Sequence, residues 1–270
     1  MASDPNQEWE PSDIAALAAA YHSLEHPSLG ARLTDLLGTP IEIGLKKLPQ
    51  GWQDKVQRVS RTALGSALKL ALTTMNGNKS PYPALGRMLH KAAVVLTGAA
   101  GGAGGTWTLP VELPITTGIM LRAIADIARG EGEDLADPRT HMACVEVFAF
   151  GGRSKDDDAS ETGYFFVRAT LAREVTKAAE FVLEHGIVER GTPVLLRLLT
   201  RVAGRFSVQV SEKAAAQAVP IIGALGGAMI NAVFIDHFQS MARGHFAVRR
   251  LERKYGQEDV RTKYGRLRSS

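Results

Sequence analysis

Hydrophobic residues recur along the chain at the spacing of α-helices. The clearest case follows Pro49, where apolar residues return every three or four positions and polar residues occupy the opposite side. The apolar positions of this segment are Trp52, Val56, Val59, Ala63, Ala67 and Leu70. No stretch alternates strictly between apolar and polar residues, as a half-buried strand would. The pattern therefore predicts an all-α protein of about seven to ten helices.

Turn and capping residues divide this pattern into segments. Ser12 or Asp13 can cap a first helix that ends before Pro27, and a short second helix follows. Pro110 and Pro114 are expected to interrupt the chain. The later helices are expected from about residue 84 into a glycine-rich run, over 115–130, 139–151, 166–185, 193–203 and 211–218, and from a second glycine-rich run to residue 256.

Length and composition indicate one folded domain with a substantial core. The chain has 270 residues, of which 45% are hydrophobic, so global disorder is excluded. We expect residues 1–11 to be a disordered N-terminus and residues 12–256 to form the helical domain. Residues 257–270 are expected to form a basic C-terminal tail.

Cys144 is the one cysteine of the sequence, so an intrachain disulfide and a four-cysteine zinc site are both excluded. The N-terminus is acidic and polar and lacks the apolar core of a secretory signal. Both features favour a reducing, cytoplasmic location. His141 and Cys144 have helical spacing but no accompanying metal motif, so we expect neither a metal site nor a cofactor.

Positive charge is concentrated at the C-terminal end. The stretch from Arg243 to Ser270 contains nine Lys and Arg residues against three Asp and Glu residues. Such a segment attracts an anionic membrane surface, although a merely solubilising helix end is an alternative. Nucleic acid is not expected, because aromatic residues are few there and no binding motif occurs. The residues expected to bind an anionic surface are Arg243, Arg249, Arg250, Arg253 and Lys254.

Two runs are rich in glycine, "VVLTGAAGGAGGTWTLPVELP" at 94–114 and "AVPIIGALGGAMINAVF" at 218–234. Neither is followed by the lysine of a phosphate-binding loop, and Trp107 occupies the third glycine position of a dinucleotide fingerprint. Small residues four apart instead favour close helix packing, as a buried hairpin or a shallow membrane insertion. The expected helix-packing residues are Gly98, Gly101, Gly102, Gly105, Gly223 and Gly227.

Two long strings of the sequence point to a family. "LPVELPITTGIMLRAIADIARGEGEDLADPRTHMACVEVFAFGG" and "VPIIGALGGAMINAVFIDHFQSMARGHFAVRRLERKYG" closely resemble the hallmark regions of EcsC family proteins. "LPQGWQDKVQRVSRTALGSALKLAL" is similar to the N-terminal helix of that family, so the resemblance covers residues 48–256. It implies a bacterial, mostly helical protein. The family is named for an operon that contains an ABC transporter, and it supplies no agreed catalytic residues.

Polar residues within these strings are the candidates for acid–base chemistry. Glu112, Asp126, Asp236 and His237 are weak candidates for a buried carboxylate–histidine site. Asp236 and His237 point about 100° apart around one helix, so a site would need a carboxylate from another helix. Ion pairing across helices explains the same residues without catalysis.

The sequence thus favours a non-enzymatic protein of the EcsC type that associates with a membrane or with another protein. An anionic membrane surface or a membrane protein such as a transporter is the expected partner, at the inner face of the membrane. The alternative is a hydrolase or other enzyme built on the carboxylate–histidine residues.

Overall fold

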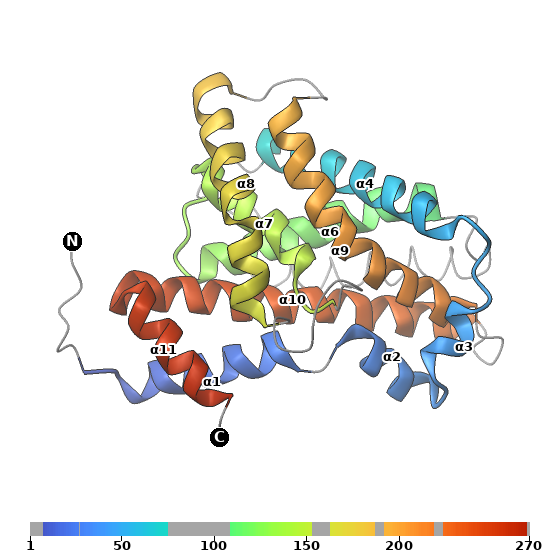
Figure 1. Cartoon of the computed structure of the whole chain (residues 1–270), viewed down its shortest axis with the longest axis horizontal. Helices are drawn as coiled ribbons and strands as arrows, with labels where there is room; N and C mark the ends of the chain where they lie inside the picture. Colours follow the sequence, from blue (N-terminus) through green and yellow to red (C-terminus); the bar gives the residue numbers. More distant parts are fainter. Residues whose placement is uncertain are drawn as a thin grey trace.

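The computed structural model describes residues 8–26, 28–74, 109–152, 163–186, 192–218 and 224–268. Within these residues the chain forms helices and no strand, so the predicted all-α single domain is confirmed (Figure 1). The helices are α1 (Pro11–Glu25), α2 (Leu29–Leu37), α3 (Ile41–Leu45), α4 (Trp52–Thr74), α6 (Leu109–Gly130), α7 (Pro138–Glu146), the short 3-10 helix η2 (Val147–Ala149), α8 (Tyr164–His185), α9 (Pro193–Gln217), α10 (Ala224–Tyr255) and α11 (Gln257–Leu267).

The longest of these helices, α10, runs across the molecule and contacts helices from every part of the chain. Its 32 residues correspond to about 48 Å of helix. Helix α1 lies along it on one side and α6 approaches it from another, while α2, α9, η2 and α11 contact it as well (Figure 1). Phe234, Phe238 and Phe246 of α10 are fully buried. The core is therefore assembled around α10.

Helix α7 and η2 form the most deeply buried part of the chain. Every residue from Thr140 to Phe150 is buried. The ring of Phe148 meets Phe206 of α9 edge to face, with 5.0 Å between ring centroids, and lies 5.2 Å from Phe238 of α10. Such aromatic pairs contribute stability beyond the area that they bury. The expectation of a short, buried helix in this stretch agrees with the structure.

Helix α9 lies between α4 and α8 and packs against both (Figure 1). Its buried face carries Leu198, Val202, Phe206 and Val210. The outward face of α9 is flanked by the polar faces of its two neighbours. This arrangement positions the surface described below.

Several boundaries differ from those expected. Helix α9 is continuous, whereas the sequence predicted two helices, over 193–203 and 211–218. Burial of Phe206 and Gln209 outweighs the weak helix preference of the stretch between them. Pro114 lies inside α6 and does not interrupt it, although the helix forgoes the hydrogen bond that a backbone N–H would donate at this position. Asp13 lies in the first turn of α1 and is buried, while Glu10 occupies the cap position.

Residues 8–10 and 257–268 pack against the helical domain. Trp9, in the segment expected to be disordered, stacks on Tyr255 with 4.1 Å between the ring centroids. The basic tail forms α11, whose Val260 and Tyr264 are buried. The two ends meet there, because Trp9 also donates a hydrogen bond to Asp259.

The glycine-rich runs lie largely outside the described residues, which exclude Gly98, Gly101, Gly102, Gly105 and Gly223. Gly227 is buried in α10. Close backbone contact is instead seen at Gly44 of α3, where a Cβ atom would lie 2.2 Å from the carbonyl oxygen of Ala215 in α9. In the described parts of the chain, none of the helices is both long and apolar enough to cross a membrane.

Replacing Gly44 with alanine is expected to destabilise the protein by about 1–3 kcal/mol, because the new methyl group would overlap the backbone of α9. Gly265→Ala in α11 is the matched control. Nothing lies within 4 Å of its added methyl group, so it should stabilise the protein by about 0.5–1 kcal/mol. Urea denaturation of both variants checks this pair, and equal stabilities would contradict the contact between α3 and α9.

Candidate functional site

Glu112 forms a buried ion pair. Its carboxylate in α6 accepts a hydrogen bond from the ammonium group of Lys213 in α9 at 2.6 Å, and Lys213 has no solvent exposure. Burial lowers the pKa of Lys213, and the charge of Glu112 acts in the opposite direction. The ammonium group also lies 5.1 Å from the ring centre of Phe234. Glu112 therefore joins α6 to α9 beside α10.

The other candidate carboxylates form ion pairs nearer the surface. Asp126 accepts a hydrogen bond from Arg129 of the same helix at 2.9 Å. Asp236 of α10 accepts one from Arg32 of α2 at 2.6 Å and lies 3.9 Å from Arg243. These contacts are those of structural ion pairs.

His237 is fully buried and contacts an amide side chain. Its Nε2 atom lies 3.2 Å from Nε2 of Gln209, which donates a hydrogen bond to the carbonyl oxygen of Phe150 at 2.7 Å. Burial, and to a smaller extent the charge of Arg32, lower the pKa of His237 to about 3. Gly151, at a φ of 73°, packs so closely against the ring of His237 that a side chain at position 151 would overlap it. His237 is therefore neutral at neutral pH.

The four candidates consequently do not form a common site. Only the sequence neighbours Asp236 and His237 interact, through charge. Glu112 and Asp126 have separate partners. The convergence of carboxylates on a histidine, which the enzyme hypothesis requires, is not found among these residues.

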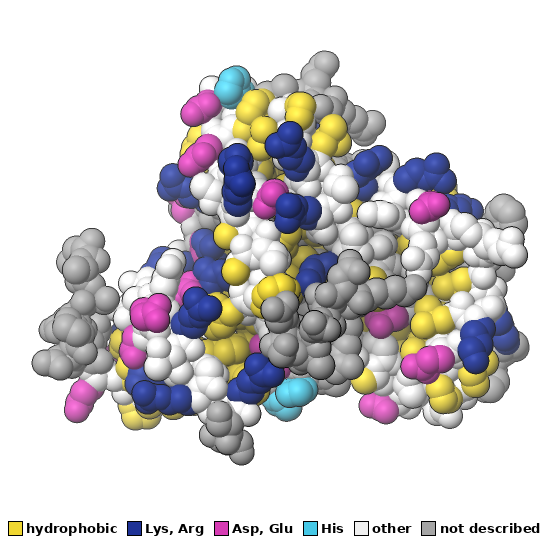
Figure 2. Space-filling view, viewed as in Figure 1, with side chains coloured by type: hydrophobic (Ala, Val, Ile, Leu, Met, Phe, Trp, Pro, Cys, Tyr) yellow, Lys and Arg dark blue, Asp and Glu magenta, His cyan; other side chains and the backbone are white. Residues whose placement is uncertain are grey.

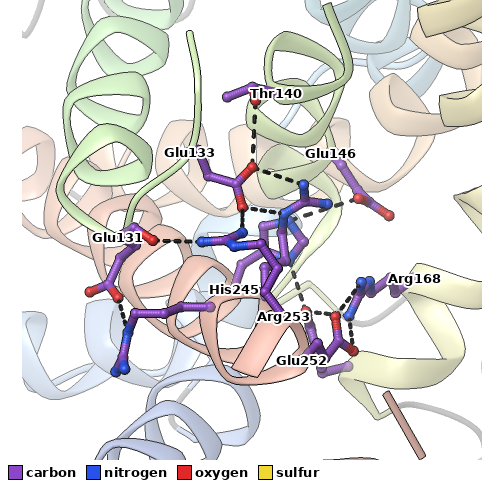
Figure 3. A network of polar contacts seen from close by, with 11 residues as sticks. Glu131, Glu133, Thr140, Glu146, Arg168, His245, Glu252 and Arg253 are labelled. Carbon is purple, nitrogen blue, oxygen red and sulfur yellow. Dashed lines mark hydrogen bonds and ion pairs between the residues drawn. The ribbon is translucent and has the colours of Figure 1, made fainter. Parts of the chain in front are cut away.

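A different polar network surrounds α10, and sequence reasoning missed most of it (Figure 3). Glu133, in the turn between α6 and α7, accepts two hydrogen bonds from Arg249 at 2.8 and 2.9 Å and another from Arg253. Thr140 lies 3.4 Å from the same carboxylate. Burial acts to raise the pKa of Glu133, but the two guanidinium groups outweigh it and the pKa is lowered.

The second half of the network joins α7, α8 and α10. Arg168 donates two hydrogen bonds to Glu252, at 2.7 and 2.8 Å (Figure 3). The hydroxyl of Tyr164 lies 2.8 Å from Nδ1 of His245, and Nε2 of His245 lies 3.9 Å from Glu146. Burial raises the pKa of Glu146 to about 7.

A tyrosine, a histidine and a glutamic acid in this order could relay a proton. Tyr164, His245 and Glu146 are at most 3% exposed, however, and none of them lines either of the two surface hollows described below. The arrangement therefore holds three helices together. The sequence did indicate one member of this arrangement, because Glu146 is a lone charge in an apolar stretch.

The metal candidates are also buried. Neither ring nitrogen of His141 has a hydrogen-bond partner among the described residues, and burial raises the pKa of the Cys144 thiol. Where the structure describes the chain, no three His, Cys, Asp or Glu side chains are grouped so that they could hold a metal ion.

The cations expected to bind an anionic surface are engaged within the protein. Arg250 and Lys254 both bind Asp13 of α1, at 2.9 and 2.8 Å, and these contacts lower the pKa of Asp13 to about 2. Arg249 and Arg253 bind Glu133. Arg243 is half exposed and lies 3.9 Å from Asp236. Their position in α10 thus makes these residues part of the fold, which the sequence pattern did not indicate.

The family comparison supports the resemblance noted in the sequence. The model of the EcsC protein family matches residues 41–251, which is most of the chain. The chain belongs to the EcsC protein family. No curated protein and no solved structure is significantly similar to it. The match includes α10 as far as Leu251, together with Glu133, Glu146, Arg168, His245 and Arg249 of the network, while Glu252 and Arg253 lie just beyond it.

A second cluster of cations on this EcsC protein remains exposed. Two hollows lie on either side of Thr200 in α9, one of about 620 Å³ toward α8 and one of about 390 Å³ toward α4. Figure 2 shows Lys and Arg side chains gathered over this part of the surface. We call the polar lining of both hollows the α9 trough, which consists of Asp54, Gln57, Arg58, Arg61, Arg173, Glu174, Lys177, Arg197, Thr200 and Arg201.

The α9 trough is strongly positive, because it contains six cations and two carboxylates. Glu174 forms an ion pair with Arg201 at 3.2 Å. Among the described residues, no carboxylate forms an ion pair with the other five cations, which are Arg58, Arg61, Arg173, Lys177 and Arg197. The trough is therefore the best candidate for a binding surface.

Glu112→Gln is expected to destabilise the protein by about 3–5 kcal/mol, because it leaves the charge of Lys213 buried without a partner. The double variant Glu112→Gln/Lys213→Met removes both charges and should recover most of the loss. Chemical denaturation measures both free energies of unfolding. A double variant no more stable than the single one would contradict this account of the pair.

Glu146 is expected to make stability depend on pH. Its folded pKa of about 7 lies above the ordinary value of 4.5, so its contribution is complete below pH 4.5 and is lost as pH rises to 7. Glu146→Gln should remove this decline, which amounts to about 3 kcal/mol. Burial also raises the pKa of Glu212 to about 7, so the difference between wild type and variant isolates Glu146. Parallel stability curves from pH 4 to 8 would contradict the assignment.

Proposed function

We propose that this EcsC family protein is a non-catalytic peripheral protein that binds an anionic membrane surface through the α9 trough. The observation that supports the proposal is the set of five exposed cations without an ion pair among the described residues. Exposed arginine and lysine side chains keep their full charge available to a partner. The paired cations of α10 do not.

The strength of such binding follows from the number of cations. Each Lys or Arg close to an anionic leaflet contributes about 1 kcal/mol, and salt screens the attraction. Five such residues are sufficient to hold a protein at a surface reversibly. Helices α4, α8 and α9 present them from three directions around one trough.

We place this surface at the inner face of a bacterial membrane, in agreement with the family resemblance and with the single, buried cysteine. Anionic lipids of the cytoplasmic leaflet supply the charge that the trough lacks. The acidic face of a membrane protein, such as a transporter, would meet the same cations, and the experiment below separates it from lipid. The hydrolase alternative gains no support from the separate pairing of Glu112, Asp126 and Asp236.

Vesicle flotation tests the proposal. The intact protein is expected to float with vesicles of phosphatidylglycerol and phosphatidylcholine, but not with phosphatidylcholine alone, and to be released by salt. The triple variant Arg173→Gln/Lys177→Gln/Arg197→Gln should bind about 100-fold more weakly, since it removes three contributions of about 1 kcal/mol each.

A matched variant in α11 serves as the control. Arg261→Gln/Lys263→Gln/Arg268→Gln removes the same charge from the basic tail and should retain most of the binding. Loss of binding in this variant alone would assign the interaction to the tail. Failure of the intact protein to bind anionic vesicles would leave an acidic protein as the partner and overturn the membrane proposal.

A further inference from the structure

The larger hollow of the α9 trough has the size of a ligand site. It occupies about 620 Å³ between α8 and α9, within the usual range for small-molecule pockets. Arg173 and Lys177 lie one turn apart on α8, and Arg197 and Thr200 lie one turn apart on α9. Cations from two helices thus face one concave space that also contains a hydroxyl group.

The lining of this hollow changes from apolar to cationic along α9. Val194 and Leu196 lie in the first turn of the helix, and Arg197 and Arg201 follow. From Val194 to Arg197 the rise along the axis is about 4.5 Å. Figure 2 shows hydrophobic side chains at the upper end of α8 and α9 and basic side chains below them. The apolar and the charged parts of the lining are therefore neighbours along α9, as the acyl chains and the phosphate are in a phospholipid.

One of the cations is held in place by the protein, which leaves the others for a ligand. Arg201 binds Glu174 at 3.2 Å and also lies 3.4 Å from the carbonyl oxygen of Thr170. Arg173, Lys177 and Arg197 are exposed and have no ion pair among the described residues. Guanidinium groups match phosphate oxygens in geometry as well as in charge.

We infer that the hollow between α8 and α9 binds the head group of one anionic phospholipid. The phosphate lies among Arg173, Lys177 and Arg197, and the acyl chains leave past Val194 and Leu196. This inference rests on the proposed function and makes it specific, because it assigns a saturable site for a single lipid rather than a general attraction to charge.

The direction of the site agrees with the orientation of a lipid in a bilayer. The acyl chains of a membrane lipid point away from the aqueous phase, so the apolar end of the hollow faces the membrane. Leu183, in the last turn of α8, and Leu196 are 53% and 39% exposed at this end. Exposed apolar side chains beside cations are typical of proteins that lie in a membrane interface. The α8–α9 end of the protein is therefore the part that touches the bilayer.

Calorimetric titration of the full-length protein with soluble dihexanoyl phosphatidic acid, below its micellar concentration, tests the site. Binding is expected to saturate at one lipid per protein. Dihexanoyl phosphatidylcholine and inorganic phosphate should each bind at least about tenfold more weakly, since the first adds a positive charge and the second lacks the apolar part. Arg197→Gln should weaken binding of the phosphatidic acid by at least about tenfold.

Arg58→Gln is the matched control, because Arg58 lines the smaller hollow of the same trough. It should weaken vesicle binding and leave titration with the short-chain lipid unchanged. Equal affinity for inorganic phosphate would identify a free phosphate compound as the ligand and overturn the lipid assignment. Vesicle binding without saturable binding of the short lipid would overturn the site and preserve the proposed function. Absence of both would overturn both.

Discussion

Charge buried beside a single long helix organises this protein. Helix α10 carries Arg249, Arg250 and Arg253, which are partly exposed, and Glu252, whose carboxylate is buried like those of Asp13 and Glu133. A buried carboxylate without a partner would cost several kcal/mol. Each of these side chains is neutralised by a residue from another element, and the partners come from α1, from the turn after α6 and from α8. The need to pair these charges, together with the apolar packing of α10, fixes the surrounding helices against it. Hydrophobic burial alone is less directional and would allow the surrounding helices to shift along α10.

This requirement divides the cations of the protein into two groups. The ion-paired cations of α10 hold the helices together. Their charge is therefore balanced within the protein, and their side chains are fixed in position. The exposed cations of the α9 trough have no ion pair where the structure describes the chain, apart from Arg201. A surface that keeps unpaired cations around a hollow has lost the small stabilisation that ion pairs would supply. That loss is understandable if the charges are used in binding, which is the basis of our proposals.

The apparent acid–base groups of this fold are buried rather than exposed to a substrate. Catalysis needs a titratable group that reaches a substrate as well as a shifted pKa. His237 and Glu146 have strongly shifted pKa values, but both are enclosed by side chains and backbone. Their shifts are caused by burial, and burial is also what separates them from solvent. The surface of the α9 trough offers the opposite combination of exposed charge and open space.

The sequence by itself determined the class of fold, the family and most helices, because apolar periodicity and long matching strings are local properties of a chain. It also singled out Glu112, Asp236 and His237 as polar residues in apolar surroundings. Only the tertiary structure decided which charges have partners. Arg250 and Asp13 are 237 positions apart and form an ion pair, whereas Arg173 and Lys177, equally basic in the sequence, have none among the described residues. Pairing depends on which helix faces which across the core, and spacing along one helix carries no information about that contact.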